Sequence, residues 1–256
     1  MTLDFYTPAI FCSLARLRLL FQKLIYYFFE KNNQLYYFSL QSGKTQFIRR
    51  LLKWRQLLFN PVPKKVVYIY STLNSTIESM LEEGLIHKAV KDVPNTFEAM
   101  EKLLSPFYSE GLFLILDDAL SQLVSSSFLP RMFEEFSHHN NCSIMFVSQS
   151  TFLDSPSYRR LSENSHYVIC LRNKRNPAKI RLLASQAKPC NIKFILDTYV
   201  DAVQPKRIIK TNDQIQNFNY GYYIFNFNLS QPEIMNYMTS IFPNELEPVT
   251  VYIEKI

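Results

Sequence analysis

Ser42, Gly43, Lys44 and Thr45 form the stretch whose residue types and spacing are best suited to chemistry. Tyr36–Phe38, just before it, is apolar and aromatic, as in a buried strand. The apolar residues that follow recur at helical spacing: Phe47, Leu51, Trp54 and Leu58. A strand, a tight turn and a helix are thus predicted in succession, and this arrangement presents backbone N–H groups at a helix N-terminus, where a phosphate binds.

The residue types of this turn match a phosphate-binding loop (P-loop) for ATP and Mg²⁺. The backbone N–H groups of Ser42 to Thr45 would surround the phosphates, and Lys44 would place a positive charge at the β- and γ-phosphates. The hydroxyl of Thr45 would be a ligand of Mg²⁺. Ser42, Gly43, Lys44 and Thr45 are therefore predicted to bind the nucleotide.

The loop signature is incomplete. The pattern G-x-x-x-x-G-K-[ST] requires glycine where this chain has Phe38, and many such loops also have glycine at the position of Gln41. Glycine permits positive φ and a close approach of the backbone to phosphate. The loop is therefore expected to be either distorted or inactive, and a chance tetrapeptide at a helix start is the alternative interpretation.

Leu112–Asp118 is a continuous apolar run that ends in two acidic residues. Such a run is typical of a central parallel strand whose carboxyl end enters an active site. It resembles a Walker B motif, in which Asp117 would hold Mg²⁺ through its water shell and Asp118 would orient the attacking water. The structural alternative is a core strand whose Asp118 caps the next helix. The position about 70 residues after the P-loop favours the functional interpretation.

Cys142–Gln149 is another apolar run, and it ends in Ser148 and Gln149. In a P-loop sheet the strand after the Walker B strand lies beside the P-loop strand. Gln149 is therefore a candidate to contact the γ-phosphate or the lytic water. A lone Gln at a strand end usually has no such role.

Composition and element order set the fold class. The 47% hydrophobic and 15% aromatic content excludes a disordered chain, and the net charge of +6 is compatible with a polyanionic partner. The 4 Cys have no C-x-x-C spacing, which favours reduced thiols and an intracellular location. Strands alternate with helices, so an α/β fold with a mostly parallel, doubly wound sheet is expected. Residues 1–34 are predicted to be a divergent helical segment, without a membrane span, and residues 35–256 the P-loop domain.

The ordered motifs resemble the genome-packaging ATPases of the FtsK/HerA class, as found in double-stranded DNA viruses, adintoviruses and Polinton/Maverick elements. The resemblance runs from about Ser42 to Phe242. Its motifs are Ser42–Phe47, Phe113–Asp118, Ser137–His139, Val147–Gln149, Tyr158–Tyr167, Leu171–Asn173, Leu183–Gln186, Tyr220–Tyr222 and Ile241–Pro243.

This resemblance implies a RecA/HerA-like ATPase subunit that moves double-stranded DNA into a capsid, working as a homo-oligomeric ring with a capsid or portal partner. It also implies that Gln149 is a sensor and that Arg159 or Arg160 is an arginine finger for a neighbouring subunit. The location would be the nucleus or cytoplasm of a host cell, or the virion if the gene is still viral. Residues 1–37 match nothing in the family, so replacement of an ancestral glycine-rich start is one hypothesis.

Two other function classes remain open. The missing glycines fit a domesticated, catalytically impaired P-loop protein that serves as a DNA- or protein-interaction module. A small-molecule kinase would need an acceptor pocket and a lid, which no motif marks. A cluster of basic residues between positions 172 and 181 consists either of DNA contacts or of a solvated loop and helix face: Arg172, Lys174, Arg175, Lys179 and Arg181.

Overall fold

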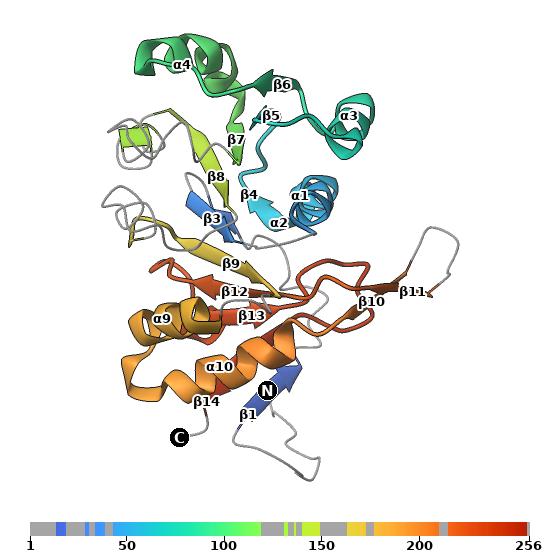
Figure 1. The fold of residues 1–256 in the computed structure, drawn as a ribbon, viewed down its shortest axis with the longest axis vertical. Helices are drawn as coiled ribbons and strands as arrows, with labels where there is room; N and C mark the ends of the chain where they lie inside the picture. The colour runs from blue at the N-terminus through green and yellow to red at the C-terminus, as the bar shows by residue number, and fades with distance from the viewer. Residues whose placement is uncertain are drawn as a thin grey trace.

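A computed structural model of the chain describes residues 14–18, 29–30, 34–38, 43–118, 131–132, 136, 140–148, 163–172, 177–209 and 215–254. Its main element is a ten-stranded sheet (Figure 1). The strands are β1 (Leu14–Arg18), β3 (Gln34–Phe38), β5 (Lys65–Tyr70), β6 (Lys88–Lys91), β7 (Leu112–Asp117), β8 (Cys142–Ser148), β9 (Tyr167–Leu171), β12 (Tyr222–Asn226), β13 (Tyr237–Thr239) and β14 (Thr250–Glu254).

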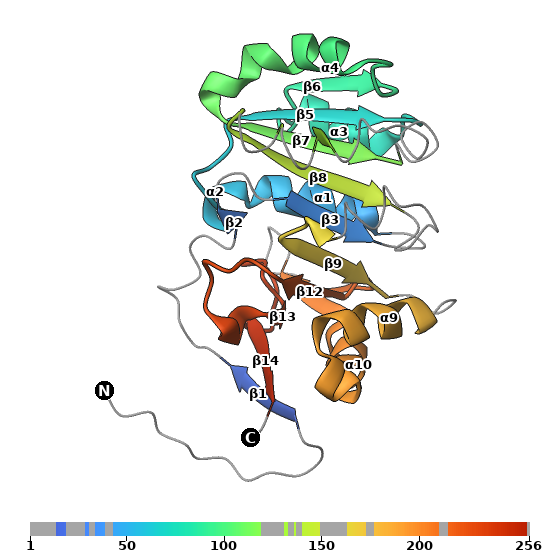
Figure 2. The same cartoon turned by 90° about the vertical axis from the view of Figure 1, so that its left-hand side faces the viewer.

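The strands lie in the order β1-β14-β13-β12-β9-β3-β8-β7-β5-β6, and in Figure 2 they follow one another from β1 at the bottom to β6 at the top. All pairs from β9 to β6 are parallel, whereas β12, β13, β14 and β1 add antiparallel pairs at the other end. Strand β8 lies between β7 and β3, as expected for the strand that follows the Walker B-like strand. The predicted α/β fold with a mostly parallel sheet is confirmed.

Alternate residues of the central strands face two separate apolar clusters. In β7, Phe113 and Ile115 pack with helices α1 (Lys44–Lys53) and α3 (Ser75–Glu82). Leu112, Leu114 and Leu116 pack on the other side with α4 (Phe97–Leu104), α9 (Pro177–Ala187) and α10 (Ile192–Ala202). The helices therefore cover both faces, and the sheet is doubly wound as predicted. Asp117 continues the series of Phe113 and Ile115, so its side chain belongs to the α1 face.

One local expectation needs correction. The apolar residues from Phe47 to Leu58 recur at helical spacing, but they do not lie on one helix, because Trp54 has φ −100° and ψ 12° and separates α1 from α2 (Arg55–Leu58). Helix α4 begins after its N-cap Thr96, whose Oγ1 accepts a hydrogen bond from Ala99 N at 3.1 Å.

The predicted N-terminal helix is wrong over Leu14–Arg18. These residues form β1, which pairs with β14 in an antiparallel register from Leu14 opposite Glu254 to Arg18 opposite Thr250. Leu17 lies between two arginines, a period-2 pattern that suits a strand as well as the helical spacing suits a helix. Pairing with a segment more than 200 residues away decides between them.

The remaining described elements lie outside the main sheet. Strands β2 (Phe29–Glu30) and β4 (Phe59–Asn60) form a short parallel pair, and β10 (Lys206–Ile209) pairs with β11 (Ile215–Phe218). The short helices are η1 (Ser105–Glu110), η3 (Pro189–Asn191) and η4 (Glu233–Met235). Within the described ranges, no helix has the length and apolar character that crossing a membrane requires.

Candidate functional site

The carboxyl ends of three neighbouring parallel strands meet at one edge of the sheet. Phe38, the last residue of β3, is opposite Ser148 at the end of β8, and Asp117 at the end of β7 is opposite Val147. The P-loop-like turn and the Walker B-like acids are therefore at the same level of the sheet, with one strand between them. In open α/β sheets this edge is where ligands bind.

Gly43 provides the turn that starts α1. Its φ is 118°, in the region that favours glycine, and its carbonyl accepts the hydrogen bond of Phe47 N at 2.8 Å. A Cβ at this position would lie 2.8 Å from the Tyr220 ring, so a side chain is excluded by contact as well as by φ. The close contact with Tyr220 and the positive φ together explain why this position is glycine.

The first turn of α1 differs from that of three other helices. Side chains cap α3, α4 and α10: Asn74, Thr96 and Asn191. The N-cap of α1 is glycine, which has no capping side chain, and the first turn contains no acidic residue. The partial positive charge of this helix N-terminus is therefore not offset by its own cap or first turn, which suits an anion.

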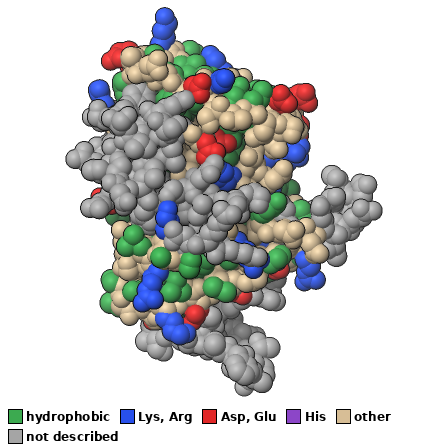
Figure 3. Space-filling view, in the orientation of Figure 1, with side chains coloured by type: hydrophobic (Ala, Val, Ile, Leu, Met, Phe, Trp, Pro, Cys, Tyr) green, Lys and Arg blue, Asp and Glu red, His purple; other side chains and the backbone are tan. Residues whose placement is uncertain are grey.

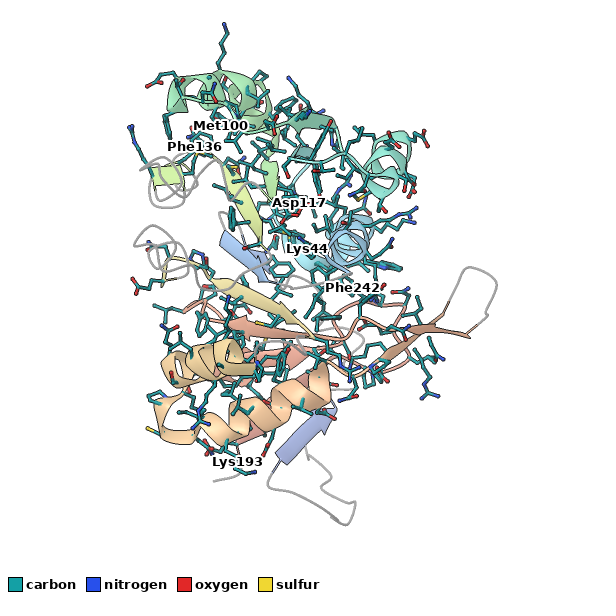
Figure 4. All side chains as sticks on the ribbon, in the orientation of Figure 1. Lys44, Met100, Asp117, Phe136, Lys193 and Phe242 are labelled. Carbon is teal, nitrogen blue, oxygen red and sulfur yellow. The ribbon has the colours of Figure 1, made fainter. Side chains whose placement is uncertain are left out.

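Lys44, the first residue of α1, reaches the acids at the end of β7. Its Nζ lies 3.0 Å from Asp118 Oδ1, and the ion pair is partly buried. Figure 4 shows Lys44 and Asp117 at neighbouring positions between α1 and the sheet. In the space-filling view, an acidic group (red) lies next to a basic group (blue) near the middle of the upper half of the molecule (Figure 3). The predicted proximity of Lys44 to the acidic strand end is thus present in the structure.

Asp118 occupies a special backbone conformation. Its φ is 51°, the left-handed region, and its N–H donates to Val147 O at 3.2 Å. Asp and Asn are among the non-glycine residues that best tolerate this conformation. The turn directs the Asp118 carboxylate toward Lys44, while Asp117 stays buried in the sheet.

Asp117 is buried against α1 and has one oxygen fixed. Tyr68 Oη donates to Asp117 Oδ2 at 2.6 Å, whereas Asp117 Oδ1 has no hydrogen-bond partner among the described residues. Burial raises the pKa of the Asp117 carboxyl, and the charge of Asp118 raises it further; the hydrogen bond from Tyr68 and the charge of Lys44 lower it. A buried acceptor without a partner is costly, and Asp117 Oδ1 is available to accept a bond from a bound group.

The residues present fit Mg²⁺. This cation prefers carboxylate, hydroxyl and water oxygens. Asp117 Oδ1 supplies a buried carboxylate oxygen, and Thr45 supplies a hydroxyl in the first turn of α1. The predicted pair of ligands, Thr45 and Asp117, therefore comes from the two elements that meet at the site.

A buried ion pair attaches α1 to the C-terminal part of the chain. Arg50 Nη2 donates to Glu245 Oε1 at 2.9 Å and to Asn244 Oδ1 at 3.1 Å, and the guanidinium lies over the Phe242 ring at 4.1 Å. Tyr222 Oη donates to Glu245 Oε2 at 3.0 Å. Burial raises the pKa of Glu245, and the charge of Arg50 opposes this rise. Helix α1, which begins at Lys44, is thus attached to the C-terminal part of the chain through Arg50.

Several predicted site residues lie outside the described part of the chain: Ser42, Gln149, Arg159 and Arg160, together with Gln41 of the incomplete loop. Their roles stay predictions. Of the basic cluster, Lys174 and Arg175 are also outside, whereas Arg172 and Arg181 are described and exposed.

Sequence analysis gave no role at the site to Tyr68, and it named Tyr220 only as part of the Tyr220–Tyr222 motif. Tyr68 lies among the buried apolar residues of β5, Val66, Val67 and Ile69. A buried phenol needs a hydrogen-bond partner, and this was a usable signal. Tyr220 belongs to the connection between β11 and β12. Its contact with Gly43 joins positions 177 residues apart, and no local pattern indicates it.

Comparisons with known proteins give similarity in structure alone. No protein-family model matches the chain, and no curated protein matches its sequence. The chain is similar to the genome packaging NTPase B204 from Sulfolobus turreted icosahedral virus 2 in complex with ATP-gammaS, with 13% identity and a TM-score of 0.46 over 78% of this chain and 93% of that one. It is also similar to the flagellar accessory protein FlaH from Methanocaldococcus jannaschii, with 11% identity and a TM-score of 0.45 over 88% and 91%.

Proposed function

We propose that the chain is an ATP-binding and ATP-hydrolysing subunit that moves double-stranded DNA. The observation that carries the nucleotide site is the convergence of Lys44, Asp118 and Asp117 at the N-terminus of α1, with one buried Asp117 oxygen left for a ligand. A cation, a helix N-terminus and two carboxylates at the carboxyl ends of parallel strands are what phosphoryl transfer requires.

The proposed roles follow from what each group offers. Backbone N–H groups at Gly43 to Thr45 bind phosphate oxygens, and Lys44 adds positive charge where the transferred phosphoryl becomes most negative. Asp118 orients the attacking water and accepts its proton. Thr45 and Asp117 would hold Mg²⁺, which when bound neutralises part of the charge on the phosphates.

Residues outside the described part complete the proposal. Gln149 directly follows β8, the strand between β3 and β7, and is assigned to the water or the γ-phosphate. Arg159 or Arg160 would serve the site of a neighbouring subunit in a homo-oligomeric ring. Double-stranded DNA and a capsid or portal partner rest on the sequence resemblance to packaging ATPases.

A non-catalytic interaction module is the second candidate. Phe38 and Gln41 replace the loop glycines, and Lys44 is held by Asp118. A protein of this kind would bind DNA or a partner without any dependence on ATP.

Phosphate release from ATP, measured with and without duplex DNA, tests the proposal. We expect hydrolysis that duplex DNA accelerates, and a loss of about 100-fold or more in Lys44→Ala, because the phosphates lose their nearest cation. Lys53→Ala is the matched control, since Lys53 lies at the other end of α1 and pairs with Glu83 Oε2 at 3.3 Å. ATP-independent DNA binding without hydrolysis would favour the interaction module instead.

A further inference from the structure

We propose that Tyr68 is a positioning residue for the nucleotide site: its hydroxyl holds one oxygen of Asp117 so that the other is presented to the nucleotide-bound cation. This inference rests on the proposed function and adds a residue that the P-loop and Walker B-like patterns do not contain. The two residues belong to neighbouring strands, since Tyr68 is in β5 and Asp117 ends β7.

The geometry restricts the Asp117 carboxylate. Tyr68 is fully buried, and its Oη donates to Asp117 Oδ2 at 2.6 Å, a short bond of the kind a phenol makes to a carboxylate. In the parallel register Tyr70 is opposite Asp117, so Tyr68 lies two residues earlier on the same face. Its side chain therefore reaches along the strand to the carboxylate, and rotation of the carboxylate would break this bond.

The two oxygens of Asp117 consequently have different roles. Oδ2 is occupied by Tyr68, whereas Oδ1 is buried without a hydrogen-bond partner among the described residues. A carboxylate with one oxygen held by the protein loses less conformational freedom on binding a cation than a free one. Outer partners that orient a ligand in this way contribute substantially to metal affinity.

Tyr68→Phe tests the inference in the full chain, because phenylalanine keeps the ring and removes only the hydroxyl. The dissociation constant of a fluorescent ATP analogue is measured in excess Mg²⁺ and again in EDTA. We expect the affinity in Mg²⁺ to fall by about 10-fold or more and the affinity in EDTA to stay unchanged. A purely structural defect would weaken both affinities alike.

Tyr223→Phe is the matched control. Tyr223 is also buried, and its Oη lies 2.9 Å from Thr198 Oγ1 in the cluster on the opposite face. This variant loses one buried hydroxyl and should bind as the parent does in both conditions. If the parent binds with Mg²⁺ dependence and Tyr68→Phe has the same dependence, the inference is overturned alone. If the parent binds no nucleotide in either condition, the proposed function is overturned and the inference with it.

Discussion

Asp118→Asn is expected to abolish most ATP hydrolysis while strengthening nucleotide binding. Asn removes the charge and the basic oxygen but keeps the size and tolerates the left-handed conformation at φ 51°. A water-orienting base contributes about 100-fold or more to the rate, so phosphate release should fall by at least that factor. The fold should be retained.

The gain in binding follows from the ion pair between Lys44 Nζ and Asp118 Oδ1 at 3.0 Å. The triphosphate must displace Asp118 from Lys44, and Asp118 also repels the phosphates. Without this partly exposed ion pair to displace, the free energy of nucleotide binding should become more favourable by on the order of 1 kcal/mol. The dissociation constant should therefore fall about 3- to 10-fold.

Single-turnover hydrolysis and equilibrium binding separate the two effects of Asp118→Asn. Asp197→Asn is the control, because Asp197 pairs with Lys193 Nζ at 2.6 Å within α10, away from the site. Weaker binding together with unchanged hydrolysis would contradict the roles assigned to Asp118.

Glu245→Ala is expected to lower the free energy of unfolding by about 3–5 kcal/mol, because it leaves the buried Arg50 guanidinium without its carboxylate. Tyr222 would also lose its acceptor at 3.0 Å. Since Arg50 belongs to the helix that starts at Lys44, nucleotide binding should weaken as α1 loses its attachment. Urea denaturation followed by fluorescence measures the loss.

The control for Glu245→Ala is a variant of a more exposed carboxylate that also pairs with α1. Glu83 forms ion pairs with Arg49 and Lys53, and all three side chains are partly exposed. Glu83→Ala should therefore cost no more than about 1 kcal/mol. Equal losses in the two variants would show that Glu245 has no special role in holding α1.

The central strands, and the meeting of the P-loop-like turn with the acidic strand end, were predictable because their signals are local. Leu112–Asp117 is an apolar run that ends in an acid, which is typical of a strand buried on both faces. The P-loop-like turn and the acidic strand end were recognised from residue type and spacing, and the register of β3, β8 and β7 brings them together. The parallel order then follows from alternating strands and helices.

The rest depends on contacts between distant residues. Strand β1 exists because β14 pairs with it, and its five residues fit a helix equally well in isolation. Arg50 and Glu245 are 195 residues apart, so neither is distinguishable by sequence from a solvated charge. Tyr68 was visible as a buried phenol, but its partner is set by the register of β5 with β7. Local patterns cannot supply these pairings.

Calorimetric titration of the parent protein with ATP and Mg²⁺, alongside Lys44→Ala, tests the central claim most directly. The claim is that the N-terminus of α1, Lys44 and the acids of β7 form a nucleotide site despite Phe38 and Gln41. We expect saturable binding with a dissociation constant of about 1 μM to 1 mM, and at least about 10-fold weaker binding in Lys44→Ala. Absence of binding by the folded parent, or equal binding by both proteins, would contradict the claim.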